Sequence, residues 1–180
     1  MKFSLHFANT NFPDAAGAKR LTLAAEAAGF ESVVVVEHVV WPTTYASRYP
    51  YAPTGRLPGG PETKLPDPLI WIAFAAAVTT RLRFLTGILI LPQRNPVVLA
   101  KELATLDDMS GGRIDVGIGV GWLKEEFEAI GVPIPRCRED RVVSVGGVER
   151  SADRLDAVIS YQVVIRPSER ALHSKPQEHL

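Results

Sequence analysis

Cysteine is nearly absent from this 180-residue chain, in which Cys137 is the only one. A single cysteine excludes an internal disulfide and a cysteine-based zinc site. An excess of one charge is also absent, because 20 basic residues balance 20 acidic ones and the formal net charge is zero. This balance gives no electrostatic reason to expect a nucleic-acid partner or binding to an anionic membrane. Ser144, His173 and His179 form no recognisable catalytic triad or metal set, so we expect no metal site.

Long apolar runs are missing as well. No apolar segment approaches the ~20 residues that a membrane-spanning helix needs. The first ten residues, MKFSLHFANT, lack a basic region followed by a long apolar run, and so do not resemble a signal peptide. We therefore expect a cytoplasmic protein with no membrane partner. Its length is sufficient for one domain with its own hydrophobic core.

Buried-strand patterns alternate with capped helices along the first three quarters of the chain. The clearest example is the apolar run at 82–91, which is followed by Asn95-Pro96, a capping residue and a proline suited to the first helical position. The full pattern predicts strands at 3–7, 32–36, 82–90 and 113–119, and helices at 14–29, 69–79, 95–110 and 123–130. Such alternation is typical of α/β proteins, so we expect four parallel neighbouring strands in chain order, with helices on the outer face.

Residues 39–66 break this pattern. They carry six prolines and three tyrosines, and they follow the end of a predicted strand. Loops of this length without secondary structure are usually either functional or disordered. Tyr45, Arg48 and Tyr49 can form a lid over a strand-end pocket, although a solvated loop is the more frequent outcome.

Histidines at strand ends are the first candidates for chemistry. Glu37-His38 follows the second predicted strand, and the carboxyl ends of parallel strands are where α/β barrels place their active sites. Histidine is also the side chain most easily held near a neutral pKa. The alternative is a histidine whose hydrogen bonds are satisfied in a structural junction. His6 lies near the tip of the first strand and can line the same pocket or face solvent.

Glycines interrupt the third and fourth predicted strands. Gly87, between Thr86 and Ile88, marks close approach of a ligand or of another backbone, or a simple bulge. Gly117, Gly119 and Gly121 are spaced as GxGxG, which is out of register with the dinucleotide-binding fingerprint. We interpret them as a strand end where a flat ligand can touch the backbone. Four more polar residues lie nearby in the sequence. Arg94 and Asn95 can contact a ligand, although Asn95 is already explained as a helix cap. Glu125 and Glu126 are expected to be solvated helix charges.

The stretch LPQRNPVVLAKELATLDDMSGGRIDVGIGVGW resembles the bacterial luciferase-like oxidoreductases, and within them the branch that uses a deazaflavin coenzyme instead of FMN. Residues 24–39 and 65–87 are similar to the same family, and the match runs from residue 1 to about 135. The resemblance implies a (β/α)8 barrel. Because such a barrel takes roughly 250 residues, this chain is expected to contain only about the first four β/α units, a partial barrel.

The resemblance also implies a cofactor and roles for particular residues. It implies coenzyme F-420, the deazaflavin, with FMN as the alternative, and hydride transfer or monooxygenation of a small organic substrate. His38 is then the catalytic residue near the reactive ring, and a non-proline cis peptide bond is expected at Gly87-Ile88, supporting that ring. The residues implied to bind the cofactor are Glu37, Thr86, Gly87, Ile88, Gly119, Gly121 and Trp122. Sugar-phosphate dehydrogenases of the family have a catalytic carboxylate at about the position of Trp122. A tryptophan there argues against a sugar-phosphate substrate and suits an apolar pocket wall.

Residues 136–180 depart from the family pattern, so we divide the chain into a half barrel at 1–135 and an atypical, poorly ordered tail. The tail can result from a shifted reading frame, or the protein can be a genuine short form. A third and less favoured interpretation is that VGGVERSADRLD imitates a phosphate-binding loop and helix. Its patterns allow strands at 142–145 and 161–165 and a helix at 151–159. The rival to an enzyme is a truncated, non-catalytic half barrel. Its two open sheet edges would favour pairing, and we expect a homo-oligomer.

Overall fold

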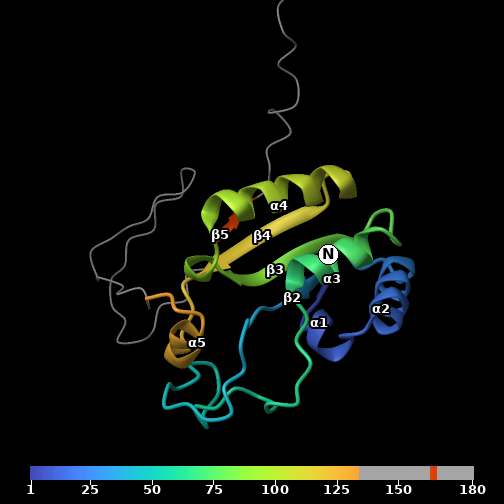
Figure 1. The fold of residues 1–180 in the computed structure, drawn as a ribbon. Coiled ribbons are helices and arrows are strands. Elements are labelled where there is room, and N and C mark those ends of the chain that lie inside the picture. Colours follow the sequence, from blue (N-terminus) through green and yellow to red (C-terminus); the bar gives the residue numbers. More distant parts are fainter. Residues whose placement is uncertain (134–162, 166–180) are drawn as a thin grey trace, which may run out of the picture.

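Four parallel strands stand side by side in chain order and are linked by helices (Figure 1). The computed structural model describes residues 1–133 and 163–165. The strands are β1 (Ser4–Leu5), β2 (Ser32–Val35), β3 (Arg83–Ile90) and β4 (Ile114–Gly119). The register pairs β1 with β2, β2 with β3, and β3 with β4, always in parallel. The predicted order and direction of the four strands are therefore confirmed.

The predicted helices are present, and their ends follow the capping residues. They are α2 (Ala15–Ala27), α3 (Pro68–Ala76), α4 (Pro96–Ser110) and α5 (Lys124–Ala129). Asp14, Asp67 and Asn95 accept hydrogen bonds from backbone amides in the first turns of α2, α3 and α4. Helix α4 ends at Gly111, whose φ of 72° is a conformation that glycine adopts without strain.

Two short elements were not predicted. Helix α1 (Ala8–Asn11) follows β1 directly, so β1 is shorter than the expected 3–7, and Phe7 takes a left-handed φ of 59° at the junction. Asn9 of α1 is fully buried, and its amide bonds both the N–H and the carbonyl of Val36. A 3-10 turn (Leu91–Gln93) lies between β3 and α4. A helix of four residues is too short to produce a periodic sequence signal.

The hydrophobic core lies between one face of the sheet and helices α2, α3 and α4. Val33, Val35 and Phe84 contribute from the strands, and Trp71 and Ile72 contribute from α3. Side chains at alternate strand positions, such as Val34, point to the opposite face because strand side chains alternate. The helical layer therefore covers one face, and the site described below is built at the carboxyl ends of the strands.

A fifth strand, β5 (Val163–Ile165), pairs antiparallel with β4. It falls within the strand predicted at 161–165. It also covers the edge of β4, so the expectation of two open parallel edges is wrong at that edge. The strand expected at 142–145, the helix expected at 151–159 and the expected disorder of the tail lie outside the described residues. Within the described ranges, no helix is both long and apolar enough to cross a bilayer.

Residues 39–66 form no helix or strand, as predicted. They run from the end of β2 across the carboxyl ends of the strands and return to α3. Glu125 and Glu126 of α5 hold the first half of this loop by hydrogen bonds to backbone amides.

Replacing Gly117 by alanine is expected to destabilise the fold, because a Cβ atom there would lie 2.3 Å from the Thr86 carbonyl oxygen. Backbone atoms cannot give way as a flexible side chain can, so we expect a loss of about 1–3 kcal/mol of unfolding free energy or more. Urea denaturation of the G117A variant measures this loss. The G60A variant is the control, because a Cβ at Gly60 meets no described atom within 4 Å. Equal stability of the two variants would contradict the close packing of β3 on β4.

Candidate active site at the strand ends

His38 is held in place by a buried carboxylate from another part of the chain. Its Nδ1 lies 2.8 Å from Oε2 of Glu126 on α5, and only 13% of the His38 side chain is exposed. The other carboxylate oxygen of Glu126 accepts hydrogen bonds from the amides of Val39 (2.5 Å) and Val40 (3.2 Å). Burial alone would raise the pKa of Glu126, but the hydrogen bonds from His38 and these amides hold it below its ordinary value. Glu126 is therefore an ionised acceptor that fixes the imidazole.

The adjacent Glu125 holds the next part of the loop. Its Oε1 accepts hydrogen bonds from the amides of Ala46 (2.7 Å) and Ser47 (3.2 Å), and the Ser47 hydroxyl accepts one from the Lys124 amide. Burial raises the pKa of Glu125, but the hydrogen bonds from Ser47 and Ala46 lower it to about 2. The expectation that Glu125 and Glu126 are solvated helix charges is wrong, because both carboxylates bind backbone amides of the 39–66 loop.

Aromatic rings surround His38. The Trp122 ring lies 5.9 Å from the His38 ring and the Trp41 ring lies 6.4 Å from it, measured between centroids. Tyr45 and Tyr49 of the loop lie against Trp122 at 6.0 and 5.2 Å. Edge-to-face pairs at such distances stabilise by about 0.5–1.5 kcal/mol each beyond their buried area. The rings of Tyr45 and Tyr49 thus pack against the Trp122 ring. A lid over the pocket that includes these two tyrosines and Arg48 stays a prediction.

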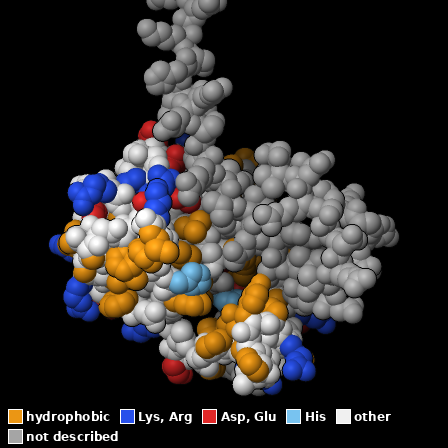
Figure 2. Space-filling view, turned by 180° about the vertical axis from the view of Figure 1, so that it is seen from behind, with side chains coloured by type: hydrophobic (Ala, Val, Ile, Leu, Met, Phe, Trp, Pro, Cys, Tyr) orange, Lys and Arg blue, Asp and Glu red, His pale blue; other side chains and the backbone are white. Residues whose placement is uncertain are grey.

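A cavity of about 380 Å³ opens beneath this loop. His38 lines it together with Phe7 and Asn11 from the β1–α1 segment and Trp41 and Tyr49 from the loop. On the face seen from behind in Figure 2, histidine side chains lie among hydrophobic ones. No lysine, arginine, aspartate or glutamate is among the described residues that line this cavity. A small, mostly apolar ligand can therefore reach the imidazole.

Glu37 points away from this cavity. Its side chain is 1% exposed, and the carboxylate binds the guanidinium of Arg94 and accepts a hydrogen bond from the Ile90 amide at 2.5 Å. Arg94 also pairs with Asp67 at 2.8 Å, so these three side chains tie the ends of β2 and β3 to the start of α3. Burial raises the pKa of Glu37, and the hydrogen bonds from Arg94 and Ile90 oppose that rise. The structure gives Glu37 a structural partner, and a cofactor contact by it stays a prediction.

The third strand contains the expected cis peptide bond, between Gly87 and Ile88. The register between β3 and β4 shifts at this point, between Thr86 and Leu89. Thr86 is 1% exposed, and its hydroxyl bonds both the N–H and the carbonyl of Gly117, so it joins the two strands. A cofactor contact by Thr86 stays a prediction. A Cβ at Gly87 would meet the Val34 side chain at 2.6 Å and lie 3.6 Å from Nε2 of His6.

The glycines after β4 are explained in part by packing. Gly121 has a φ of 79°, and a Cβ there would lie 2.8 Å from both Ile90 and Phe127. Gly119 ends β4 opposite Ile90. The site residues expected to converge therefore form two groups at the same edge of the sheet. His38 lines the cavity with Trp122 packed against it, and Gly87 lies beside His6. Among the described residues, neither of the two cavities is lined by all of them.

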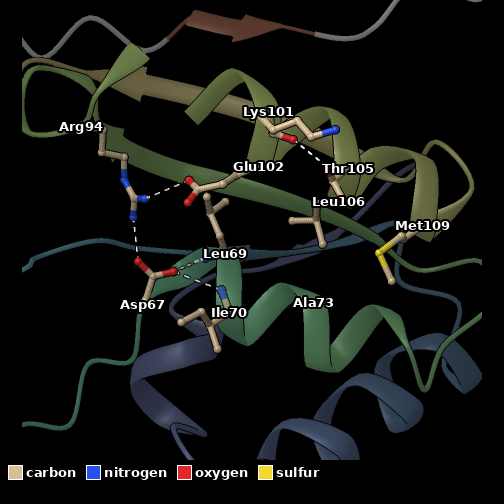
Figure 3. Close-up of a pocket in the computed structure, with 10 residues that line it drawn as sticks. All are labelled: Asp67, Leu69, Ile70, Ala73, Arg94, Lys101, Glu102, Thr105, Leu106 and Met109. Atoms are coloured by element: carbon tan, nitrogen blue, oxygen red, sulfur yellow. Dashed lines mark hydrogen bonds and ion pairs between the residues drawn. The ribbon is translucent and has the colours of Figure 1, made fainter. Parts of the chain in front are cut away.

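A second cavity, of about 410 Å³, lies between α3 and α4 on the outer face (Figure 3). Arg94 reaches both Asp67 and Glu102 there, and Leu106 and Met109 lie further along α4. This groove runs along the outer face of the two helices, and none of its described lining residues is a histidine. In the described part of the chain, no cluster of three or more histidine, cysteine, aspartate or glutamate side chains is arranged to hold a metal ion.

Acid is expected to release the 39–66 loop before the fold is lost. Glu125 and Glu126 have pKa values below their ordinary value of 4.5, so the stability they contribute is present above about pH 4.5 and is lost as the pH falls through their folded-state values. For Glu125 this window lies between about 4.5 and about 2. Tryptophan fluorescence reports the loop through Trp41 and Trp122, and ellipticity reports the helices. The E125Q variant should lose part of the acid transition, whereas E128Q, at an exposed position, should keep it.

Comparison with known proteins agrees with the fold. The family model for luciferase-like monooxygenases matches residues 1–142. This chain belongs to that family. An uncharacterized protein from Mycobacterium tuberculosis is 37% identical over 114 residues, which are 63% of this chain. The matched region is 40% of the length of that relative, so the chain spans less than half of the curated proteins it matches first.

Solved structures show the same arrangement. A monooxygenase from Streptomyces bottropensis matches with a TM-score of 0.56 and 33% identity, over 74% of this chain and 37% of that one. The oxygenating constituent of 3,6-diketocamphane monooxygenase from Pseudomonas putida, in complex with FMN, matches with a TM-score of 0.55 and 23% identity, over 73% and 32% of the two chains. The coenzyme F-420-dependent tetrahydromethanopterin reductase from Methanopyrus kandleri matches with a TM-score of 0.52 and 23% identity, over 73% and 30%. The last two share the fold alone. The expected partial (β/α)8 barrel is thus confirmed.

Proposed function

We propose that this family member works as an oxidoreductase with a flavin-type cofactor, transferring hydride to or from a small organic substrate or oxygenating it. The observation that carries the proposal is His38, oriented by Glu126 at the carboxyl edge of a parallel sheet and lining a cavity. Family membership and the FMN- and deazaflavin-dependent structural neighbours support a flavin-type cofactor. The deazaflavin, coenzyme F-420, is proposed over FMN because residues 91–122 resemble the deazaflavin branch.

The described residues fit the ring of such a cofactor. The Gly87-Ile88 segment is half-buried at the strand ends, and Gly87 has no side chain to stand between the backbone and a flat ring. We propose that this segment, with Gly119, Gly121 and Trp122, supports the ring. When bound, a deazaflavin supplies hydride chemistry, and FMN would also permit reaction with oxygen. No cationic side chain lines the cavity among the described residues, so the proposal assigns no phosphate site there.

The proposed role of His38 is to hold or deliver a proton. Because Nδ1 is bonded to an ionised Glu126, this nitrogen carries a proton, and Nε2 is the atom proposed to meet the reacting group. The carboxylate fixes the tautomer and the ring orientation, which is the usual task of an acid behind a catalytic histidine. Tyr45, Tyr49 and Trp122 exclude water from the same region. Self-association of the chain stays a prediction, which sedimentation would test.

Cofactor fluorescence tests this function. The purified protein is titrated into coenzyme F-420, FMN and riboflavin, and quenching is followed to saturation. We expect the wild-type chain to quench cofactor fluorescence to saturation, most strongly for the deazaflavin. FMN and riboflavin should bind with similar affinity, because they share the ring that makes the proposed contacts. The H38A variant should still bind, since the proposed ring support is backbone and Trp122, and E128A serves as a surface control. Absence of quenching for all three cofactors would contradict the proposal.

A further inference from the structure

We infer that the cavity under the 39–66 loop binds a flat, uncharged and largely apolar organic molecule with one polar group that meets His38. Calling this molecule the substrate rests on the proposed function, whereas its binding does not. The cavity volume of about 380 Å³ lies within the range of roughly 300–1,000 Å³ that is typical of small-molecule pockets.

The walls of the cavity determine the shape and polarity of the ligand. Phe7 lines the cavity from the segment between β1 and α1, and the 39–66 loop contributes Trp41, Tyr49, Leu57 and Leu65. Three of these five side chains are aromatic, and aromatic faces and edges favour planar rings in offset or edge-to-face contact. Tyr49 is further held by Trp122 and by Tyr51, whose rings lie 5.2 and 5.5 Å from it. The wall is therefore fixed before a ligand arrives.

The electrostatics of the cavity exclude a charged ligand. Its described lining contains no lysine, arginine, aspartate or glutamate side chain. The nearest carboxylates, Glu125 and Glu126, are already bonded to loop amides and to His38. Burial raises the pKa of the Tyr49 phenol, which keeps that group neutral. An ion in this cavity would lose hydration without gaining a partner, at a cost of several kcal/mol.

Among the polar side chains that line the cavity, Asn11 is exposed, and two threonine hydroxyls already have a partner in the chain. The Thr10 hydroxyl donates to the Phe7 carbonyl, and the Thr63 hydroxyl accepts from the Gly60 amide. His38, with Nδ1 bonded to Glu126, is the residue placed to bond a carbonyl or hydroxyl group of the ligand through Nε2. The outer cavity between α3 and α4 is a useful contrast, because Asp67, Arg94, Lys101 and Glu102 all line it.

Two probes with the same ring system and different charge test this inference. Cofactor-free protein is titrated calorimetrically with 2-naphthol, which is neutral, and with 2-naphthalenesulfonate, which is an anion. We expect 2-naphthol to bind at least about tenfold more tightly, because the sulfonate would be buried without a counter-ion. Equal affinities, tighter binding of the sulfonate, or no binding of 2-naphthol at millimolar concentration would overturn the inference.

Variants locate the binding to this cavity. L57D places a carboxylate in the half-buried wall and should weaken 2-naphthol binding about tenfold or more, by the same desolvation cost. Y49A tests the aromatic wall without adding charge, in case L57D does not fold. The matched control is I70D, which places a carboxylate in the outer cavity and should bind 2-naphthol as the wild type does. Unchanged binding in folded L57D and Y49A would place the probe elsewhere. The 2-naphthol titrations use cofactor-free protein. A failed cofactor titration would therefore overturn the proposed function without changing the outcome of the 2-naphthol experiment.

Discussion

Replacing Glu126 by alanine is expected to lower the free energy of unfolding by about 3–5 kcal/mol, the range found when one partner of a buried ionic pair is removed. Glu126 is fully buried and accepts hydrogen bonds from His38 and from the Val39 and Val40 amides. The alanine variant would leave all three donors without this acceptor. Urea denaturation followed by ellipticity measures the change. Glu128, two residues further along α5, is the matched control, because its exposed pair with Lys124 should contribute only about 0.3–0.5 kcal/mol.

The E126Q variant separates charge from shape. Glutamine can still accept from the two loop amides, so it should retain more stability than alanine does. Its single oxygen cannot accept from both loop amides and from Nδ1 as the carboxylate does, so the imidazole should change its tautomer or its orientation. Nitrogen-15 spectra of His38 report this change directly. If His38 gives the same spectra in E126Q as in the wild type, Glu126 does not orient the imidazole.

Replacing His38 by alanine is expected to lower turnover by about 10²–10⁴-fold, the usual contribution of a general acid or base. This holds for whichever substrate the protein turns over with a flavin-type cofactor. Cofactor affinity should change far less, because the proposed ring contacts are the backbone at Gly87-Ile88 and the Trp122 ring. Steady-state kinetics and cofactor titration on the same preparation measure the two effects. The E126Q variant should fall between wild type and H38A, with a shifted pH profile.

The outcome that contradicts this prediction is a folded H38A variant with nearly full turnover, or one that loses cofactor binding and turnover equally. The first result would remove His38 from the chemistry. The second would assign it to binding. His6 is the natural comparison, because it lies at the tip of β1 near Gly87 but is not among the residues lining the cavity.

Most of the fold could be predicted because its signals are local. Continuous apolar runs mark β2, β3 and β4, and Asp67 and Asn95 mark the starts of α3 and α4. The position of His38 at a strand end could also be predicted, since parallel strands end at one edge of the sheet. Helix α1 could not be predicted, because its four residues are shorter than any periodic pattern and depend on the contact of Asn9 with Val36.

The role of Glu126 was missed, although the sequence carries a signal for it. Leu123, Phe127 and Ile130 form the apolar stripe of α5, and Glu126 lies three residues after Leu123 on the same side. A carboxylate on an apolar stripe needs a buried partner, and that partner is 88 residues away in His38. The packing role of the glycines could not be predicted for a related reason. Gly117 and Gly121 pack against Thr86, Ile90 and Phe127, contacts that only the tertiary structure brings together.

The most direct test of the account is to map where a flavin-type ring binds. Amide and histidine signals of nitrogen-15-labelled protein are followed by NMR during titration with coenzyme F-420 and, separately, with FMN. We expect the largest changes at His38, Ile88 and the Trp122 indole, and none at Ile70 or Lys101 in the outer cavity. Largest changes between α3 and α4, or no localised change with either cofactor, would contradict a ring site at the strand ends.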